Sequence, residues 1–246
     1  MKELKQIQRI LAFGDKWFYV KDLEQDYHSQ YGYIKKEDLA KKSGIVKTNT
    51  GKELTIFTPS FIDSYRKIKR GPQIISLKDL GLIITQTGIN RTSKVLDAGA
   101  GSGAVACMLG NLVKQVVTYE IRDDFAEIVS QNIKYLGLKN VLLKKKNIYE
   151  GIDEKNLDLI ILDLPEPWNV PDIEKALKIG GFIVSYSPTV PQAMDFVNKI
   201  SKNENFVHFK TVELIERDWE IIERKVRPMS RMIGHTGFLS FVRRVK

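Results

Sequence analysis

Five short apolar runs between residues 94 and 187 alternate with segments long enough for helices, and this alternation limits the possible folds more than any other feature. One intervening segment, residues 123–137, is amphipathic, as expected of a helix. Strands that alternate with helices are typical of βαβ units, whose strands pair in parallel. We therefore expect an α/β fold with a mostly parallel sheet. Its predicted strands are residues 94–99, 115–120, 140–145, 157–164 and 181–187.

The two ends of the chain differ from this central pattern. Residues 1–68 contain short β-type runs at 16–20, 44–48 and 53–59, divided by polar turns, which predicts a small β-rich domain. Residues 60–73 read as a short basic helix that stops at Gly71-Pro72. We therefore expect the larger domain to span residues 69–246. Within it, residues 211–228 and 237–245 resemble two long strands with no helix between them, which predicts an antiparallel pair at one edge of the sheet.

Charge and cysteine content narrow the classes of function. The chain has 39 Lys and Arg against 30 Asp and Glu, a net charge of +9. Such a balance fits a polyanionic partner or a lysine-rich solubilising surface, and charge alone does not separate the two. One cysteine excludes a disulfide within the chain and a cysteine-rich zinc site; Cys107 lies in an apolar run and is predicted to be a core residue. Three dispersed histidines predict no metal site.

Neither a secretion signal nor a membrane span is apparent. The first ten residues, MKELKQIQRI, lack the pattern of a signal peptide. No apolar run approaches the roughly 20 residues that a bilayer-spanning helix needs. We expect a soluble cytoplasmic protein without a membrane partner.

A glycine-rich turn, VLDAGAGSGAVACML, follows the first of the five strands and precedes a helix. Its glycines permit close approach of a ligand, and the helix N-terminus offers unpaired N–H groups. Glu120 ends the next strand, where a carboxylate can accept hydrogen bonds from both hydroxyls of a ribose. The spacing Gly99-x-Gly101-x-x-Ala104 also fits the dinucleotide fingerprint, and a tight turn without ligand is a third interpretation. Asp97 favours a ligand with an amino group, such as the methionine part of S-adenosylmethionine, over a pyrophosphate.

The run LDLPEPW, residues 162–168, places two acidic residues directly after a strand that is predicted to be buried. Asp163 stands at a strand end, where an open α/β sheet places its ligand crevice. Pro165 and Pro167 fix the following backbone, because each locks φ and removes a donor. Trp168 is predicted to pack the loop down, with stacking on a base as the alternative. Glu166 has no role that follows from the sequence and is expected to be exposed.

The glycine turn, the YE that ends the next strand and LDLPEPW together resemble the class I S-adenosylmethionine-dependent methyltransferases. Four motifs, KRGPQII (69–75), NIYEG (147–151), LDLPEPW and RMIGHTGFL (231–239), are similar to those of the tRNA (adenine-N1)-methyltransferases that act in the T loop. The resemblance covers essentially the whole chain, including the β-rich domain. It implies a Rossmann-like sheet, S-adenosylmethionine as methyl donor, tRNA as partner and a homotetramer. The implied target is N1 of adenine at position 58, with position 57 left open.

The resemblance also assigns the cofactor contacts and the catalytic residue. Asp163 matches the family's catalytic aspartate, which holds the exocyclic amino group, orients N1 and stabilises charge that develops on the ring. Asn147 stands where relatives often have Asp, and its amide oxygen can accept the same hydrogen bond from the cofactor's adenine without charge. The expected cofactor contacts are Ile75, Asp97, Gly99, Ala100, Gly101, Ser102, Gly103, Glu120, Asn147, Ile148 and Asp163.

A second set of residues is expected to contact RNA. Ser76 departs from the family, because many relatives have an aromatic residue there that stacks on the target base; Tyr149 and Tyr186 are candidates to replace it. Basic residues would contact phosphates and so position the RNA without reading its sequence; the run Lys144–Lys146 fits a solvated face better. The expected RNA contacts are Arg66, Lys69, Arg70, Gln73, Ser76, Pro165, Tyr186, Arg231, His235 and Thr236.

Three other functions stay open at this point. They are a methyltransferase for another RNA or for a protein, a nucleotide-cofactor dehydrogenase, and an RNA-binding subunit without activity. The intact GAGSG turn, Glu120 and Asp163 argue against the last of these.

Overall fold

The computed structural model describes residues 4–71 and 74–246, so Gln73, one of the predicted RNA contacts, lies outside the described residues. The chain divides into two compact units. Unit 1 is Met1–Ile68 with Lys134–Gly137, and unit 2 is Lys69–Ile133 with Leu138–Lys246. Among the described residues, no helix is long and apolar enough to cross a membrane.

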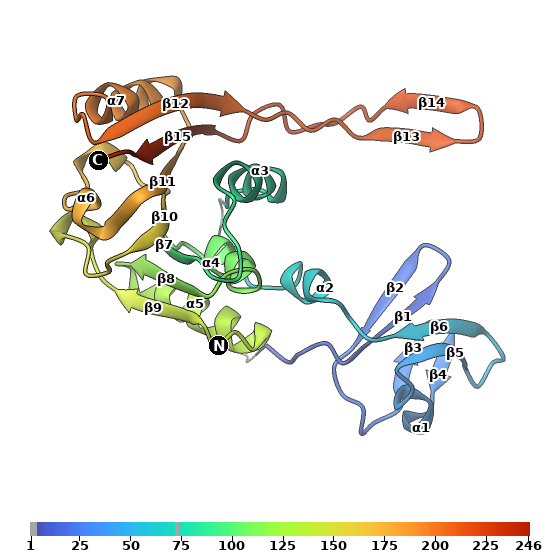
Figure 1. The fold of residues 1–246 in the computed structure, drawn as a ribbon. Coiled ribbons are helices and arrows are strands. Elements are labelled where there is room, and N and C mark those ends of the chain that lie inside the picture. Colours follow the sequence, from blue (N-terminus) through green and yellow to red (C-terminus); the bar gives the residue numbers. More distant parts are fainter. Residues whose placement is uncertain (1–3, 72–73) are drawn as a thin grey trace. The chain divides into compact units, whose positions relative to one another are not determined.

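Unit 1 is built on an antiparallel sheet with the strand order β2-β1-β6-β5, beside a separate hairpin of β3 and β4 (Figure 1). Its core consists of the buried side chains of Leu11, Val20, Ile34, Leu39, Val46, Leu54 and Ile56. The predicted β-rich character of this region is confirmed. The elements are β1 (Arg9–Phe13), β2 (Lys16–Val20), β3 (Tyr27–Ser29), β4 (Gly32–Ile34), α1 (Lys36–Leu39), β5 (Ser43–Lys47) and β6 (Glu53–Phe57).

The basic segment that follows β6 is helical over a shorter stretch than predicted. Helix α2 spans Phe61–Tyr65 and ends well before Gly71, where the predicted helix was expected to stop. At its start, the main-chain N–H of Ser60 donates to the Asp63 carboxylate at 2.8 Å. The helix cannot continue through Lys69, because the N–H of Lys69 donates to the side-chain oxygen of Asn132 and not to a carbonyl one turn earlier.

Unit 2 contains a seven-stranded sheet with the order β12-β15-β11-β10-β7-β8-β9. Strands β9, β8, β7, β10 and β11 pair in parallel, and β15 pairs antiparallel with both β11 and β12. The predicted α/β fold, with a mostly parallel sheet and an antiparallel C-terminal edge, is confirmed. The strands are β7 (Lys94–Ala98), β8 (Gln115–Glu120), β9 (Val141–Lys145), β10 (Leu157–Leu162), β11 (Leu177–Ser187), β12 (Phe206–Glu213) and β15 (Phe238–Arg244).

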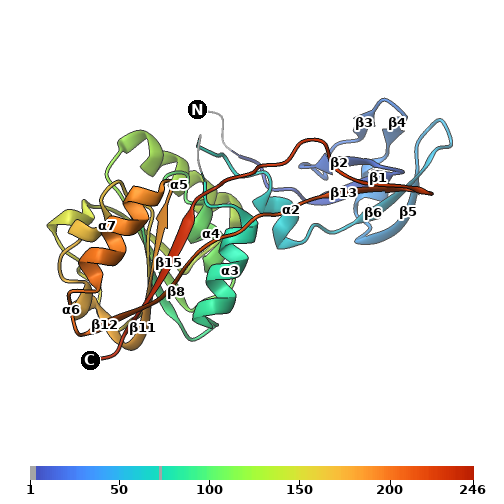
Figure 2. The ribbon, with the colours of Figure 1, turned by 90° about the horizontal axis from the view of Figure 1, so that it is seen from above.

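Helices cover both faces of this sheet, with α3 and α4 on one side and α6 and α7 on the other (Figure 2). Alternate residues of each strand therefore enter two different cores: Leu159 and Ile161 pack with α3 and α4, whereas Ile160 packs toward α6 and α7. Cys107 is fully buried in α4, as predicted for a core residue. The helices are α3 (Leu77–Thr87), α4 (Ala104–Gly110), α5 (Asp123–Leu136), α6 (Ile173–Ala176) and α7 (Val190–Ile200), with the 3-10 turns η1 (Ile148–Glu150) and η2 (Pro167–Asn169).

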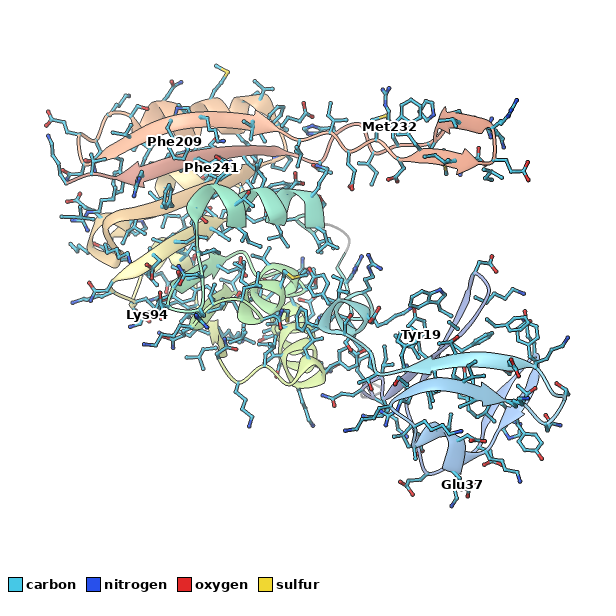
Figure 3. The ribbon with its side chains drawn as sticks, turned by 45° about the vertical axis from the view of Figure 1, so that its right-hand side comes forward. Tyr19, Glu37, Lys94, Phe209, Met232 and Phe241 are labelled. Carbon is cyan, nitrogen blue, oxygen red and sulfur yellow. The ribbon has the colours of Figure 1, made fainter. Side chains whose placement is uncertain are left out.

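The prediction of one long strand over residues 211–228 is wrong. Strand β12 ends at Glu213, and the chain then forms a separate hairpin of β13 (Trp219–Ile222) and β14 (Lys225–Pro228) beyond the ends of β12 and β15 (Figure 1). Figure 3 places Met232 on the return from this hairpin, whereas Phe209 and Phe241 lie on the main sheet. The chain reverses at Glu223, whose φ of 51° is unusual for a residue other than glycine.

Candidate active site

Three carboxylates meet at the carboxyl ends of neighbouring strands in the unit 2 sheet. Ala98 of β7 lies in register with Tyr119 of β8 and with Leu162 of β10. Because these strands are parallel, the residues at their carboxyl ends emerge together. Asp97 lies near the end of β7, Glu120 ends β8, and Asp163 follows β10. Lys94, labelled in Figure 3, marks the opposite end of β7.

Asp97 is buried with one carboxylate oxygen unsatisfied. It is 1% exposed, and its Oδ2 accepts a hydrogen bond from the Thr118 hydroxyl at 2.8 Å. Its Oδ1 is buried and has no hydrogen-bond partner among the described residues. Burial, with smaller contributions from the charges of Asp163 and Glu120, raises the pKa of Asp97 to about 7. Such an oxygen fits a ligand that brings an ammonium group.

The glycine turn passes directly beside the strand that ends in Asp163. A Cβ at Gly99, where φ is +89°, would lie 2.0 Å from the carbonyl oxygen of Asp163, so only glycine allows this approach. A Cβ at Gly101 would meet nothing within 4 Å, which leaves the space above the turn open for a ligand. The hydroxyl of Ser102 is buried and has no hydrogen-bond partner among the described residues. The turn therefore fits a bound cofactor.

Glu120 holds this turn with its carboxylate. It accepts hydrogen bonds from the main-chain N–H groups of Gly101, Ile121 and Arg122, each at 2.9 Å. A carboxylate offers about four lone-pair positions, so one remains for a ribose hydroxyl. Contact with both hydroxyls, as expected from the sequence, would require the hydrogen bond to Gly101 to be exchanged.

The other predicted cofactor contacts differ in how they are placed. The side-chain oxygen of Asn147 accepts a hydrogen bond from the N–H of Tyr149 at 3.1 Å, which caps η1 and leaves that oxygen one lone pair. Ile148 is 3% exposed and Ile75 is 1% exposed, and each packs into a core cluster. These two isoleucines can shape the walls of the crevice but present little side-chain surface to a ligand.

Asp163 occupies a half-buried position on a braced loop. Its N–H donates to the carbonyl of Ala98 at 2.9 Å, and burial raises its pKa to about 6. The loop is held by hydrogen bonds from Gln192 to the carbonyl of Pro165 and from the N–H of Glu166 to the Tyr149 hydroxyl, both at 3.2 Å. At pH 7 the Asp163 carboxyl is therefore largely ionised.

The two remaining expectations for this loop are confirmed. The Trp168 side chain packs against a core cluster, so it holds the loop down. Glu166 is exposed, and its carboxylate accepts a hydrogen bond from Asn169 at 2.9 Å.

Two of the predicted RNA contacts, Ser76 and Thr236, bind a buried acid, Asp79, that no sequence motif indicated, and a third, Tyr186, bonds to Thr236. The fully buried Asp79 carboxylate accepts hydrogen bonds from the hydroxyls of Ser76 and Thr236, both at 2.9 Å, and from the Lys78 ammonium at 2.8 Å. Lys78 also donates to the Thr236 hydroxyl at 2.7 Å. This cluster fastens the start of α3 to the start of β15.

The side chains of Ser76 and Tyr186 therefore already bind other residues of the protein. Ser76 caps α3, and the Tyr186 hydroxyl donates to the carbonyl of Thr236. Tyr186 is only 1% exposed, so its ring offers no face to a base in this structure. Tyr149 is 36% exposed beside the Asp163 loop and is the better placed of the two tyrosines for stacking.

The remaining predicted RNA contacts that the structure describes lie on the surface or bind other residues. Arg66, Arg70 and Arg231 are exposed, whereas the Lys69 ammonium donates to the side chain of Gln131. His235 is exposed, but its ring bridges Glu213 and the carbonyl of Pro188. Lys144, Lys145 and Lys146 pair with Asp153, Glu154 and Asp123, as fits a solvated face.

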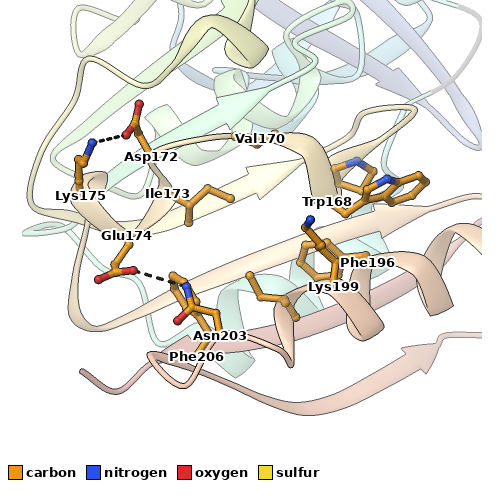
Figure 4. Close-up of a pocket in the computed structure, with 12 residues that line it drawn as sticks. Trp168, Val170, Asp172, Ile173, Glu174, Lys175, Phe196, Lys199, Asn203 and Phe206 are labelled. Carbon is orange, nitrogen blue, oxygen red and sulfur yellow. Dashed lines mark hydrogen bonds and ion pairs between the residues drawn. The ribbon is translucent and has the colours of Figure 1, made fainter.

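A cavity of about 390 Å³ lies elsewhere, between η2, α6 and α7 (Figure 4). Trp168, Phe196 and Lys199 contribute to its lining. None of the predicted site residues that the structure describes lines it, so it is not the crevice of the three carboxylates. Among the described residues, no cluster of His, Cys, Asp and Glu has an arrangement that could hold a metal ion.

Comparison with known proteins finds methyltransferases that are similar to this chain over most of its length. The tRNA (adenine(57)-N(1)/adenine(58)-N(1))-methyltransferase TrmI of Methanocaldococcus jannaschii is 35% identical, over 94% of this chain and 92% of that protein. A structure described as an S-adenosylmethionine-dependent O-methyltransferase from Thermotoga maritima has a TM-score of 0.83 and 30% identity, covering 99% of this chain and 94% of that one. The tRNA (m1A58) methyltransferase TrmI of Aquifex aeolicus has a TM-score of 0.78 and 26% identity over both full chains.

Residues 65–227 match the model of the family described as the tRNA methyltransferase complex GCD14 subunit. The match includes the glycine turn, Glu120 and the Asp163 loop. The chain belongs to this family of tRNA methyltransferases.

Proposed function

We propose that this protein transfers a methyl group from S-adenosylmethionine to N1 of adenine in the T loop of tRNA, at position 58 and with position 57 as a possible second target of the same loop. The observation that carries the proposal is the half-buried Asp163 carboxylate, held beside the glycine turn at the edge where the strands end. The relatives named for this reaction support it.

Several residues would bind the cofactor. S-adenosylmethionine supplies an electrophilic methyl group on a sulfonium. Asp97 would accept the cofactor's ammonium at its unsatisfied Oδ1, and the open turn at Gly101 would receive its body. Glu120 would hold a ribose hydroxyl, and Asn147 the adenine amino group.

Asp163 would act on the acceptor. As a carboxylate, it can accept a hydrogen bond from the N6 amino group of the target adenine and so orient the N1 lone pair. Methylation at N1 makes the ring cationic, and a nearby negative charge stabilises that product and the transition state leading to it. The base must leave its stack to reach the crevice. We propose Tyr149 as the residue that stacks on it.

A second candidate is methyl transfer to oxygen, because one close structural relative is described as an O-methyltransferase. A hydroxyl acceptor has to lose its proton during the reaction, and Asp163, whose pKa burial raises to about 6, could take it. The two reactions leave different products on RNA, a methylated base or a methylated hydroxyl.

The deciding experiment supplies labelled S-adenosylmethionine and unmodified tRNA transcripts that carry adenosine at both T-loop positions, at one of them, or at neither. Label in 1-methyladenosine that disappears when the T-loop adenosines are replaced is the expected result. Label in an O-methylated nucleoside would favour the second candidate. No transfer, despite measurable cofactor binding, would overturn the tRNA assignment and leave the methyltransferase fold standing.

We further propose a cytoplasmic homotetramer, in which residues 1–68 form the small β-rich domain and residues 69–246 the catalytic domain. The hairpin of β13 and β14 supports the assembly. Cross-strand neighbours Ile221 and Val226 are 72% and 56% exposed, and Trp219 opposite Pro228 is 56% exposed. An isolated two-stranded hairpin is marginally stable in water. A second copy of the chain would cover this apolar face.

A further inference from the structure

Asn132 breaks the apolar pattern of α5 at a fully buried position. Phe125 and Val129 lie on the same side of the helix, at the spacing that places side chains on one face. An apolar residue would continue this stripe, yet residue 132 is an asparagine with 0% exposure. Burying an amide is costly unless its hydrogen bonds are satisfied, so this side chain requires an explanation from its partners.

The Asn132 amide joins two separate stretches of backbone. Its Nδ2 donates to the carbonyl of Lys69 and to the carbonyl of Ser102, both at 2.8 Å. Its Oδ1 accepts the N–H of Lys69 at 2.9 Å. Both amide protons are therefore used, and the two bonds with Lys69 hold its main chain as a neighbouring strand would.

The neighbouring residues of α5 contact the same two stretches. A Cβ at Gly71 would lie 2.9 Å from Cε1 of Phe125, and a Cβ at Gly103 would lie 3.0 Å from Cγ1 of Val129. The Lys69 ammonium also donates to Gln131. One face of α5 thus supports Lys69–Gly71, which we call the entry segment, and the Ser102–Gly103 part of the glycine turn.

These two stretches have different proposed partners. Ser102 and Gly103 belong to the turn proposed to hold the cofactor, whereas Lys69 and Arg70 are proposed RNA contacts. Because one amide holds both, any shift of the turn on cofactor binding would change the hydrogen bonds available to the entry segment. Binding at either stretch must then affect the other by the same factor.

We propose that Asn132 is a positioning residue that couples the cofactor turn to the entry segment, so that a bound cofactor orders the segment for RNA. The assignment of RNA to the entry segment rests on the proposed function; the coupling between turn and segment does not.

Asn140 provides a matched control. Its Nδ2 likewise donates to two main-chain carbonyls, those of Gly110 and Val113, at 2.8 and 2.9 Å. These partners lie at the far end of α4 from the glycine turn. Asn132→Asp and Asn140→Asp each replace a two-fold donor with an oxygen that faces two carbonyl oxygens. Only the former touches the entry segment.

The test follows trypsin cleavage after Arg70, an exposed residue of the entry segment, by mass spectrometry with and without saturating S-adenosylhomocysteine. In the wild type and in Asn140→Asp, the ligand is expected to slow this cleavage by about 5-fold or more, the lower end of ordinary coupling. In Asn132→Asp the ratio should fall to about 1. Asn132→Ser, whose single short hydroxyl cannot reach both stretches, serves if the aspartate variant does not fold.

Three results would overturn the proposal: no protection in the wild type, equal protection in the Asn132 variants, or loss of ligand binding in every Asn132 variant that folds. The last would make Asn132 a support of the cofactor turn only. A parallel measurement of tRNA affinity with and without the ligand separates this idea from the proposed function. If the wild type shows protection at Arg70 but does not bind tRNA, the coupling stands and the substrate assignment fails.

Discussion

The backbone at Gly99 passes so close to Asp163 that a Cβ at residue 99 would lie 2.0 Å from the Asp163 carbonyl oxygen. The glycine turn and the loop that carries Asp163 are therefore in direct main-chain contact. This backbone contact fixes the distance between the proposed cofactor site and the proposed catalytic residue.

Gly99→Ala should consequently destabilise the protein more than Gly101→Ala. The clash with rigid backbone and the positive φ at residue 99 together should cost roughly 2–4 kcal/mol of unfolding free energy. At Gly101 only the positive φ of 53° is unfavourable, at about 1 kcal/mol, but the new methyl group enters the open space of the cofactor site. Urea denaturation and titration with S-adenosylhomocysteine should separate a folding defect at residue 99 from a binding defect at residue 101. Equal stability of the two variants would contradict this account.

Asp163→Ala should leave S-adenosylhomocysteine affinity within about threefold of the wild type and lower kcat by about 10²–10³, the loss typical of removing one group that stabilises transition-state charge. Because burial raises the pKa of Asp163 to about 6, wild-type kcat/KM should rise with pH through that region and then level off, as the carboxylate forms. Steady-state rates between pH 5 and pH 8 measure this. Near-normal turnover of the alanine variant would remove Asp163 from the mechanism.

Asp97→Asn should stabilise the ligand-free protein at pH 8 while weakening cofactor binding. The pKa of Asp97 is about 7 in the folded chain against 3.8 for an ordinary aspartate, so the folded state holds the proton longer. The contribution of Asp97 to the free energy of unfolding is therefore greatest below pH 4. It is lost as pH rises toward 7, by a few kcal/mol at about 1.4 kcal/mol per pKa unit.

Thermal melts at pH 5 and pH 8 check this sign. The variant should melt higher than the wild type at pH 8, the gap should narrow at pH 5, and the stabilisation by S-adenosylhomocysteine should shrink. A variant that melts lower at pH 8 would mean that Asp97 is ionised at little cost in the folded protein.

The five parallel strands could be predicted from the sequence because each contains a run of apolar residues, and the carboxylates of the site lie where those runs end. Strand β12 could not, because apolar and polar side chains alternate along it. The hairpin could not, since its reversal uses Glu223 at positive φ and lacks the Gly, Asn or Pro that marks most turns. Asp79 and Asn132 were missed for a related reason. Each is one polar residue in a helical segment, and only the packing of distant segments shows that Asp79 meets Thr236 and that Asn132 meets Ser102.

Ile221→Glu should dissociate the proposed tetramer. Ile221 lies on the apolar face of the β13–β14 hairpin and is 72% exposed in the single chain, so a charge there would be buried against the second copy. Ile179→Glu is the control, because Ile179 is similarly exposed, at 65%, but lies in β11. Sedimentation should give four chain masses for the wild type and the control, and a smaller species for Ile221→Glu. A wild type that sediments as a monomer would rule out the assembly.

Glu213→Gln should lower the pKa of His235 and loosen the start of β15. The ring nitrogens of His235 lie 2.6 Å from the Glu213 carboxylate and 2.8 Å from the carbonyl of Pro188. A carbonyl oxygen and a carboxylate oxygen both accept hydrogen bonds, and the protonated ring, which donates from both nitrogens, satisfies both. The carboxylate, followed by the Pro188 carbonyl, raises the pKa of His235 above 6.5, and the nearby Lys78 charge lowers it only partly.

The bridge therefore stabilises the folded chain below pH 6.5 and is lost as pH rises through the raised pKa of His235. Titration of the His235 ring signals by NMR, in the wild type and in Glu213→Gln, measures that pKa directly. An unchanged midpoint for His235 in this variant would show that the carboxylate does not hold the proton. Because Thr236, the next residue, donates to Asp79, opening of the bridge should also weaken the cluster that fastens α3 to β15.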